Sequence, residues 1–101
     1  MLALPIELPI EQITEFCQRN PIRKLSLFGS ILRDDFKPES DVDMLVEFIP
    51  ENRVTYFDLV GMETKLTDMV GRKVDLRTPN ELSKYFRQKV LDSALVIYVC
   101  Q

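Results

Sequence analysis

The sequence predicts an α+β domain (α/β-like), with a small mixed β-sheet of about four strands packed with helices. One observation is the alternation of helical and strand periodicity, in the order helix, strand, strand, helix, strand, helix, strand. A second is the length of 101 residues, which fits one domain over residues 1–101. A third is the hydrophobic content of 46%, which is sufficient for a core at this size. The order of the strands in the sheet does not follow from the pattern.

The first helix is expected over Pro9–Asn20, because apolar residues recur there with helical spacing. Its apolar face consists of Ile10, Ile13, Phe16 and Cys17. Pro21 ends the helix, since a proline disfavours helical backbone in the residue before it. A strand is expected over Lys24–Phe28, and Gly29-Ser30 breaks it before a short turn or helix that runs to Asp35.

The clearest strand is expected over Asp41–Ile49, after a loop over Lys37–Ser40. Alternate residues are apolar, as in a strand buried on one face: Val42, Met44, Val46 and Phe48. Thr55 and Asp58 resemble a capping box at the start of the next helix, with Asp in the place of Glu or Gln. That helix ends at Gly71. Its apolar stripe consists of Leu59, Met62, Leu66 and Met69.

The last third of the chain contains two further strands and one helix. A short strand is expected over Lys73–Arg77. The residues Thr78-Pro79, followed by Glu81, predict a helix start at this point, because threonine caps a helix, proline favours its first position and glutamate its third. This helix is expected to run to about Ser93, and Leu95–Val99 is expected to be the closing strand.

The composition excludes several classes of function. The chain has no histidine, so it cannot form a Ser-His or Cys-His catalytic pair or a self-contained zinc site. Cys17 and Cys100 lie far apart in sequence, and we expect both to be buried thiols in a reducing cytoplasm. No apolar run approaches the roughly 20 residues that cross a bilayer. The segment Met1–Glu7 lacks the basic start of a secretory signal, so we expect a cytoplasmic protein with no membrane partner.

The balance of charge limits the partners further. The net charge of −3 provides no general electrostatic footprint for nucleic acid, so we expect no direct nucleic-acid binding. A polyphosphate would have to bind at a local site, where metal ions screen its charge.

Three aspartates stand in or beside predicted strands, where Asp is normally depleted. Asp41 and Asp43 are two residues apart, so an extended backbone directs both carboxylates to one face. Asp75 stands between apolar neighbours in a later strand, and the three carboxylates converge if the two strands pair. Two like charges 4 Å apart repel by about 4 kcal/mol at an effective dielectric of 20. A divalent cation turns this repulsion into binding, and an all-oxygen ligand set favours Mg²⁺ or Mn²⁺.

Gly29 and Ser30 stand where a strand meets a predicted helix start. Glycine lets the backbone approach a phosphate closely, and exposed N–H groups with the serine hydroxyl bind its oxygens. Arg33, one turn further, is placed to reach a triphosphate or to pair with a nearby acid. Each feature also has an ordinary structural explanation. These are a common turn at Gly29-Ser30, a turn before a strand at Ser40-Asp41, an edge-strand residue Asp75 balanced by Arg77, and a solvated Arg33.

The motif Gly29-Ser30, ten residues, Asp41-Val42-Asp43 resembles the signature of the DNA polymerase beta-like nucleotidyltransferase superfamily. The wider stretch from Leu27 to Val46 resembles the minimal nucleotidyltransferases, or MNT proteins. Asp75 falls where that family places its third carboxylate. One departure is Arg33-Asp34-Asp35, where family members commonly carry Arg-Gly-Glu, and it leaves the three carboxylates unaffected.

The resemblance implies the nucleotidyltransferase fold and a Mg-dependent transfer that uses ATP. It assigns catalysis and the binding of two Mg²⁺ ions, with Mn²⁺ as the alternative, to Asp41, Asp43 and Asp75, and nucleotide binding to Gly29, Ser30 and Arg33. MNT proteins are often antitoxins that transfer AMP from ATP to a tyrosine of a HEPN-domain ribonuclease toxin. The chain lacks the acceptor domain of larger relatives, so we expect a HEPN-domain toxin as partner.

Two alternatives stay open from the sequence. One is a non-catalytic antitoxin that neutralises its partner by binding and occlusion. The other is a nucleotidyltransferase that acts on a small molecule or an RNA end, which the missing substrate domain and the acidic surface disfavour. The preferred base, the number of AMP units added and the oligomeric state do not follow from the sequence.

Overall fold

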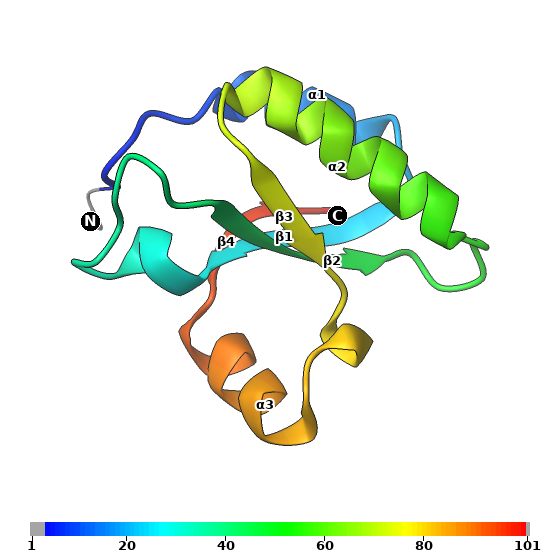
Figure 1. Ribbon diagram of the computed structural model, residues 1–101. Helices are drawn as coiled ribbons and strands as arrows, with labels where there is room; N and C mark the ends of the chain where they lie inside the picture. Colours follow the sequence, from blue (N-terminus) through cyan, green and yellow to red (C-terminus); the bar gives the residue numbers. More distant parts are fainter. Residues whose placement is uncertain (1–3, 101) are drawn as a thin grey trace.

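The computed structural model describes residues 4–100 and contains a mixed four-stranded sheet with helices on both faces (Figure 1). This arrangement confirms the predicted α+β architecture. The sheet order is β3-β2-β1-β4, with β1 antiparallel to both of its neighbours and β2 parallel to β3. The strands are β1 (Ile22–Phe28), β2 (Val42–Phe48), β3 (Val74–Arg77) and β4 (Leu95–Val99).

Residues 1–3 and 101 lie outside the described part of the chain. The expectations for the N-terminal segment and for the ends of the domain therefore fall partly outside it. Within residues 4–100, no helix has both the length and the apolar character needed to span a membrane.

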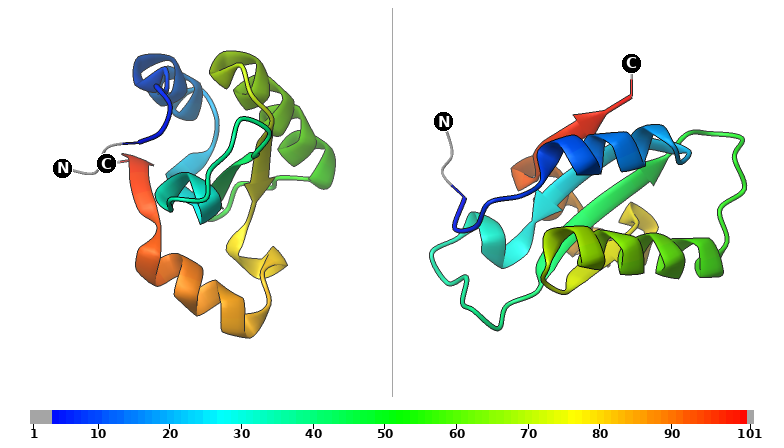
Figure 2. Two further views of the ribbon diagram at one scale, coloured as in Figure 1. Left: turned by 60° about the vertical axis from the view of Figure 1, so that its left-hand side comes forward. Right: turned by 90° about the horizontal axis from the view of Figure 1, so that it is seen from above.

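The main core lies on the face of the sheet that α1 (Ile10–Gln18) and α2 (Tyr56–Val70) cover side by side (Figure 2). The alternation expected for the second strand is confirmed, because Val42, Met44 and Val46 are fully buried in this core. The strands β1 and β3, the two helices and the 3-10 turn Gly29–Leu32 contribute the remaining buried side chains. These are Ile13, Phe16, Cys17, Ile22, Leu25, Leu27, Ile31, Leu59, Met62, Leu66, Val74 and Leu76.

The opposite face has a much smaller apolar cluster beneath α3 (Lys84–Ser93). Its buried members are Phe28, Leu45 and Val90, with Leu82 and Ala94 packed against them. Because this cluster does not extend over the whole sheet, polar side chains of β2 and β3 remain accessible on this face.

The helix α2 has the ends that the sequence predicts. The Thr55 hydroxyl accepts a hydrogen bond from the Asp58 N–H at 3.2 Å, and the Asp58 carboxylate accepts one from the Thr55 N–H at 2.9 Å. The reciprocal pair is a capping box in which Asp replaces the usual Glu or Gln. Gly71 ends the helix with a left-handed backbone, φ 76°.

The edge strand β3 is protected by side chains of α2. The Leu76 N–H donates to Glu63 Oε2 at 2.8 Å, and the Val74 N–H donates to the Thr67 hydroxyl at 3.0 Å. These outward N–H groups would otherwise be available to another strand. The contacts therefore fix α2 along this edge of the sheet.

The prediction that the last helix begins at Thr78-Pro79 is wrong. Pro79–Glu81 forms a single 3-10 turn, Leu82 and Ser83 are extended, and α3 begins at Lys84. The Ser83 hydroxyl accepts from the Phe86 N–H at 3.3 Å and caps the helix. The extended backbone places Leu82 against the apolar cluster beneath α3, which the early turn signal does not take into account.

The expectation for the two cysteines is half correct. Cys17 is fully buried, and burial raises the pKa of its thiol to about 12. Cys100 is exposed, contrary to the prediction, because it follows β4 at the edge of the sheet.

The position of the Ser83 cap at the start of α3 predicts which of two substitutions, at Ser83 or at Thr78, destabilises the protein. We expect Ser83→Ala to lower the free energy of unfolding by about 1 kcal/mol, because it removes the cap of α3. Thr78→Ala should change it by less than about 0.5 kcal/mol, since Thr78 caps no helix through its side chain. Urea denaturation measures both values. A larger loss for Thr78→Ala than for Ser83→Ala would contradict the observed start of the helix.

Candidate active site

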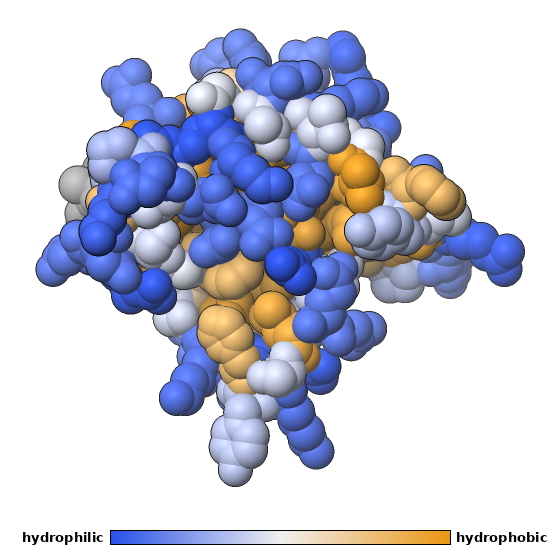
Figure 3. All heavy atoms as spheres, in the orientation of Figure 1, coloured by the Kyte–Doolittle hydropathy of each residue, from blue (hydrophilic) through white to orange (hydrophobic). Residues whose placement is uncertain are grey.

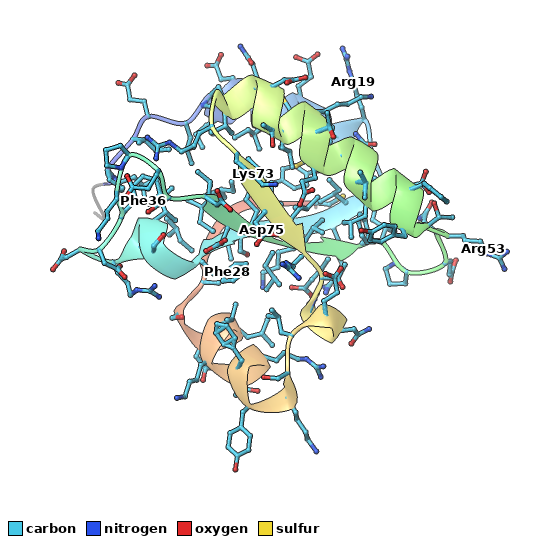
Figure 4. The ribbon with its side chains drawn as sticks, viewed as in Figure 1. Arg19, Phe28, Phe36, Arg53, Lys73 and Asp75 are labelled. Atoms are coloured by element: carbon cyan, nitrogen blue, oxygen red, sulfur yellow. The ribbon has the colours of Figure 1, made fainter. Side chains whose placement is uncertain are left out.

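Asp43 and Asp75 lie side by side on adjacent strands. The parallel register pairs Val42 with Val74, Asp43 with Asp75 and Met44 with Leu76. Because the flanking apolar residues are buried in the main core, both aspartates face the opposite side of the sheet. The antiparallel register pairs Asp43 with Phe28 as well, so these three residues form one row across β1, β2 and β3. Figure 4 labels the two ends of this row, Phe28 and Asp75.

Asp41 is near enough to Asp43 to influence its ionisation. It stands immediately before β2 and is exposed, whereas Asp43 is half-buried. The pKa of Asp43 is raised from 3.8 to about 6, first by burial and then by the charges of Asp75 and Asp41. Arg33 and Arg77 act in the opposite direction and lower this pKa. The negative charges of two aspartates, Asp75 and Asp41, therefore act on the half-buried carboxylate of Asp43.

The loop before Asp41 is held by an arginine that the sequence analysis did not single out. Arg72 Nη1 donates to the carbonyl oxygens of Lys37, at 3.0 Å, and Ser40, at 3.3 Å. Its guanidinium lies over the ring of Phe36, 4.8 Å from the centroid. Arg72 follows Gly71, so the end of α2 fixes the approach of the chain to Asp41. No local signal indicates this contact, because it joins segments far apart in sequence.

Gly29 lies so close to the Asp43 side chain that any residue with a Cβ would force that side chain to move. Its φ is +80°, a left-handed backbone that glycine adopts readily. A Cβ at this position would overlap Oδ2 of Asp43 and lie 3.1 Å from its Cγ. Gly29 therefore has two roles. It allows the left-handed turn after β1, and it leaves space for the Asp43 carboxylate. Ser30 follows it in the 3-10 turn Gly29–Leu32 and is partly buried.

Arg33 is exposed and pairs with an acid in its own loop. Its Nε lies 3.1 Å from Asp35 Oδ1, and its Nη2 lies 3.4 Å from Asp35 Oδ2. The sequence analysis expected Arg33 either to reach a triphosphate or to pair with a nearby acid. In the structure it pairs with an acid, Asp35. Its charge still reaches the site, since it lowers the pKa of Asp43.

Asp75 pairs with Arg77, as expected if Asp75 is an edge-strand residue whose charge is balanced by that arginine. Arg77 Nε lies 2.9 Å from Asp75 Oδ1, and Nη2 lies 3.4 Å from Oδ2. Among residues 4–100, no group of three or more acidic, cysteine or histidine side chains is arranged to hold a metal ion. The three aspartates are therefore not preassembled as a set of ligands, although carboxylate oxygens are the donors that Mg²⁺ prefers. Asp75 would have to exchange Arg77 for it.

A hollow of about 270 Å³ lies beside Asp75, between β3 and the start of α2. The sequence analysis missed its other polar residues, because they are scattered over three elements. Its lining is formed by Tyr56, Leu59, Val60, Glu63, Lys73, Asp75, Leu76, Arg77 and Glu81. A larger hollow of about 510 Å³ between α1 and α2 contains none of the three aspartates. The smaller one is therefore the more relevant to this site.

The contact between Gly29 and Asp43 predicts an unusual cost for a small substitution. We expect Gly29→Ala to lower the free energy of unfolding by about 1 kcal/mol more than Gly71→Ala. Both glycines have positive φ, but a Cβ at Gly71 meets no atom within 4 Å. The excess should disappear in an Asp43→Ala background, as measured by a denaturation double-mutant cycle. An equal cost in both backgrounds would show that Gly29 matters only for its backbone.

The raised pKa of Asp43 predicts that its charge destabilises the metal-free protein. A folded-state pKa above the unfolded value contributes stability below pH 4, and this contribution is lost as pH rises through about 6. We therefore expect Asp43→Asn to stabilise the protein at pH 8 by about 1–2 kcal/mol, after allowance for partial solvent screening. At pH 4 the variant and the parent should be equally stable. Thermal unfolding at both pH values checks this, and a gain of equal size at pH 4 would contradict it.

Comparisons with known proteins agree with the resemblance drawn from the Gly29 to Asp43 motif. The chain is 33% identical over 85 residues to the protein adenylyltransferase MntA of Thermococcus cleftensis, which covers 84% of this chain and 82% of that one. A candidate protein adenylyltransferase of Methanocaldococcus jannaschii is 32% identical over 77 residues, 76% of this chain and 81% of that one.

Solved structures share the fold. A candidate minimal nucleotidyltransferase matches with a TM-score of 0.71 and 28% identity, over 85% of this chain and 86% of that one. A toxin–antitoxin structure with AMP-PNP matches with a TM-score of 0.74 and 21% identity, over 93% and 76%. Residues 10–97 match the family model described as nucleotidyltransferase domain. The chain therefore belongs to the nucleotidyltransferase domain family.

Proposed function

We propose that the protein is an antitoxin nucleotidyltransferase that transfers AMP from ATP to a tyrosine hydroxyl of a partner HEPN ribonuclease toxin. The transfer releases pyrophosphate and neutralises the toxin. The observation that carries the proposal is the row of Asp43 and Asp75 on paired strands, with Asp41 nearby and Gly29 against Asp43. The proposal includes the cytoplasmic location that the sequence analysis expects.

Relatives support the choice of acceptor. One relative from Thermococcus cleftensis is named a protein adenylyltransferase. A protein of the same fold is an MNT antitoxin in complex with the tri-AMPylated HEPN toxin of Shewanella oneidensis. These names describe those proteins, and together with family membership they favour a protein acceptor for this chain over a small molecule or an RNA end.

Asp41, Asp43 and Asp75 would hold two Mg²⁺ ions, with Mn²⁺ as the alternative. When bound, the ions supply the positive charge that neutralises the triphosphate and the departing pyrophosphate. The half-buried position of Asp43 supports its role as the central ligand, because its charge is costly without a cation.

The chain's own groups hold the reactants and move one proton. Gly29 and Ser30 would bind the outer phosphates through N–H groups and the serine hydroxyl, and Arg33 would add positive charge at the rim. The acceptor oxygen bonds to the α-phosphorus while the bond from that phosphorus to the β-phosphate oxygen breaks. Asp75 would take the proton of the acceptor hydroxyl. Positioning and charge stabilisation supply most of the rate.

The exposed surface near α3 supports a protein as the acceptor. Tyr85 is 90% exposed and Phe86 is 46% exposed, and Leu91 is also exposed. Figure 3 shows apolar side chains gathered over the lower part of the molecule, where α3 lies. Exposed aromatic and aliphatic side chains of this kind are typical of protein–protein contacts.

Replacing Asp41 or Asp43 tests the proposal. We expect Asp41→Asn and Asp43→Asn each to reduce AMP transfer by roughly 100-fold or more, because each removes a carboxylate from the cation site. The measurement is the mass of a HEPN partner after incubation with ATP and Mg²⁺, where each AMP unit adds to the mass. Asp68→Asn, an exposed change on α2, should transfer at the parental rate.

Two results would overturn this function. Transfer at the parental rate in both variants would contradict the assignment of Asp41 and Asp43. Strong binding of the partner by the parent protein, with no change in the partner's mass, would favour an antitoxin that acts by occlusion.

A further inference from the structure

Arg77 covers both carboxylate oxygens of Asp75. The two residues are two apart on β3 and therefore face the same side of the sheet. The guanidinium contacts one oxygen at 2.9 Å and the other at 3.4 Å. The side chains are 31% exposed for Asp75 and 47% exposed for Arg77. Because solvent reaches both partners, the pair is weak enough to exchange.

A second carboxylate, that of Glu81, also lies near the guanidinium of Arg77. Glu81 Oε2 lies 3.8 Å from Arg77 Nη1, on the side away from Asp75's contacts with Nε and Nη2. Glu63 also contributes negative charge near Arg77, but its Oε2 accepts a hydrogen bond from the Leu76 N–H. The Thr78 hydroxyl donates to the other oxygen of Glu81, Oε1, at 3.4 Å, so Oε2 is the oxygen that Arg77 can approach. Glu81 is therefore the acid to which Arg77 can shift with the least rearrangement.

We propose that Arg77 is an exchangeable counter-ion of Asp75, which occupies this carboxylate until a divalent cation displaces it towards Glu81. The inference rests on the proposed function, which assigns Asp75 to the cation site. A carboxylate with both oxygens hydrogen-bonded to a guanidinium cannot offer them to a cation at the same time. Arg77 and the cation therefore compete for Asp75, and Arg77 is a positioning residue.

The exchange explains how the acidic cluster is accommodated before a cation binds. Arg77 and Arg33 are the two cations that oppose the rise in the pKa of Asp43. Arg33 is already paired with Asp35 in its own loop. Arg77 is thus the side chain whose positive charge directly contacts one of the three site aspartates, Asp75. The free energy needed to separate Arg77 from Asp75 therefore affects the concentration at which a divalent cation binds.

Direct binding of Mn²⁺ to the full chain, without nucleotide, tests this inference. Electron paramagnetic resonance of free Mn²⁺ measures the dissociation constant. We expect Arg77→Gln to bind Mn²⁺ roughly two- to fivefold more tightly than the parent, since the competing ion pair is lost. Arg77→Lys retains the charge but cannot cover both oxygens, so its affinity should lie between the two.

The matched control is Arg23→Gln. It removes the same charge from another exposed ion pair of the sheet, Arg23 with Glu47 at 2.6 Å. Arg23 stands at the opposite end of β1 from Phe28, which pairs with Asp43. This variant should bind Mn²⁺ as the parent does. If it gains as much affinity as Arg77→Gln, the effect is one of net charge and the exchange is refuted.

Glu81→Gln tests the second half of the exchange. In the parent it should weaken Mn²⁺ binding, because the released guanidinium loses its alternative partner. In the Arg77→Gln background it should have no comparable effect. Equal weakening in both backgrounds would overturn the shift to Glu81.

Asp43→Asn separates this inference from the proposed function. If it loses Mn²⁺ binding while Arg77→Gln binds as the parent does, the cation site stands and the exchange at Asp75 is wrong. If it binds Mn²⁺ as tightly as the parent, the cation site itself is misassigned and the inference falls with it. If Arg77→Lys matches the parent while Arg77→Gln binds more tightly, charge alone acts and the competition for both oxygens is refuted.

Discussion

The repulsion between Asp43 and Asp75 is the constraint on which the rest of the structure depends. Paired strands of a sheet lie about 4.8 Å apart, so two carboxylates in register on one face cannot avoid each other. The main core enforces this register from the other face, where Val42 packs with Val74 and Met44 with Leu76. A slip by one residue would direct the aspartates into that core. The apolar residues therefore hold the acids together against their own electrostatics.

The surrounding residues reduce this repulsion without removing it. Arg77 contacts both oxygens of Asp75, and the charges of Arg33 and Arg77 lower the pKa of Asp43. Even so, burial first, and the charges of Asp75 and Asp41 second, keep the pKa of Asp43 raised to about 6. A group with such a shift, in a cluster that other contacts hold in place, is typical of a functional site. The protein thus retains a local instability that a bound cation would relieve.

The sequence predicted the parts of this arrangement that follow from local rules. Period-two alternation identified β2 and its buried face, and it follows that Asp43 lies on the opposite face. The capping box at Thr55 and Asp58 was also predictable, because all its partners lie within one helical turn. Contacts between distant segments were not: Arg72 reaches the loop before Asp41 across 32 to 35 residues, and no spacing indicates it.

Two errors have the same origin in tertiary packing. The signals at Thr78-Pro79 produce only one 3-10 turn, because Leu82 extends to reach the cluster beneath α3 and Ser83 takes over the cap. Cys100 resembles a buried thiol by residue type but lies at the edge of the sheet. In both cases the local preference was real and the position in the fold overrode it.

The unequal covering of the two faces connects the fold to its chemistry. One face is closed by α1 and α2 and supplies most of the buried apolar side chains. The other is closed only beneath α3, where the buried apolar cluster has three members, and this leaves the row of Asp43 and Asp75 open to large reactants. A larger apolar cluster on that face would add stability, but it would cover the carboxylates. The small second cluster therefore leaves the two aspartates accessible from this face of the sheet.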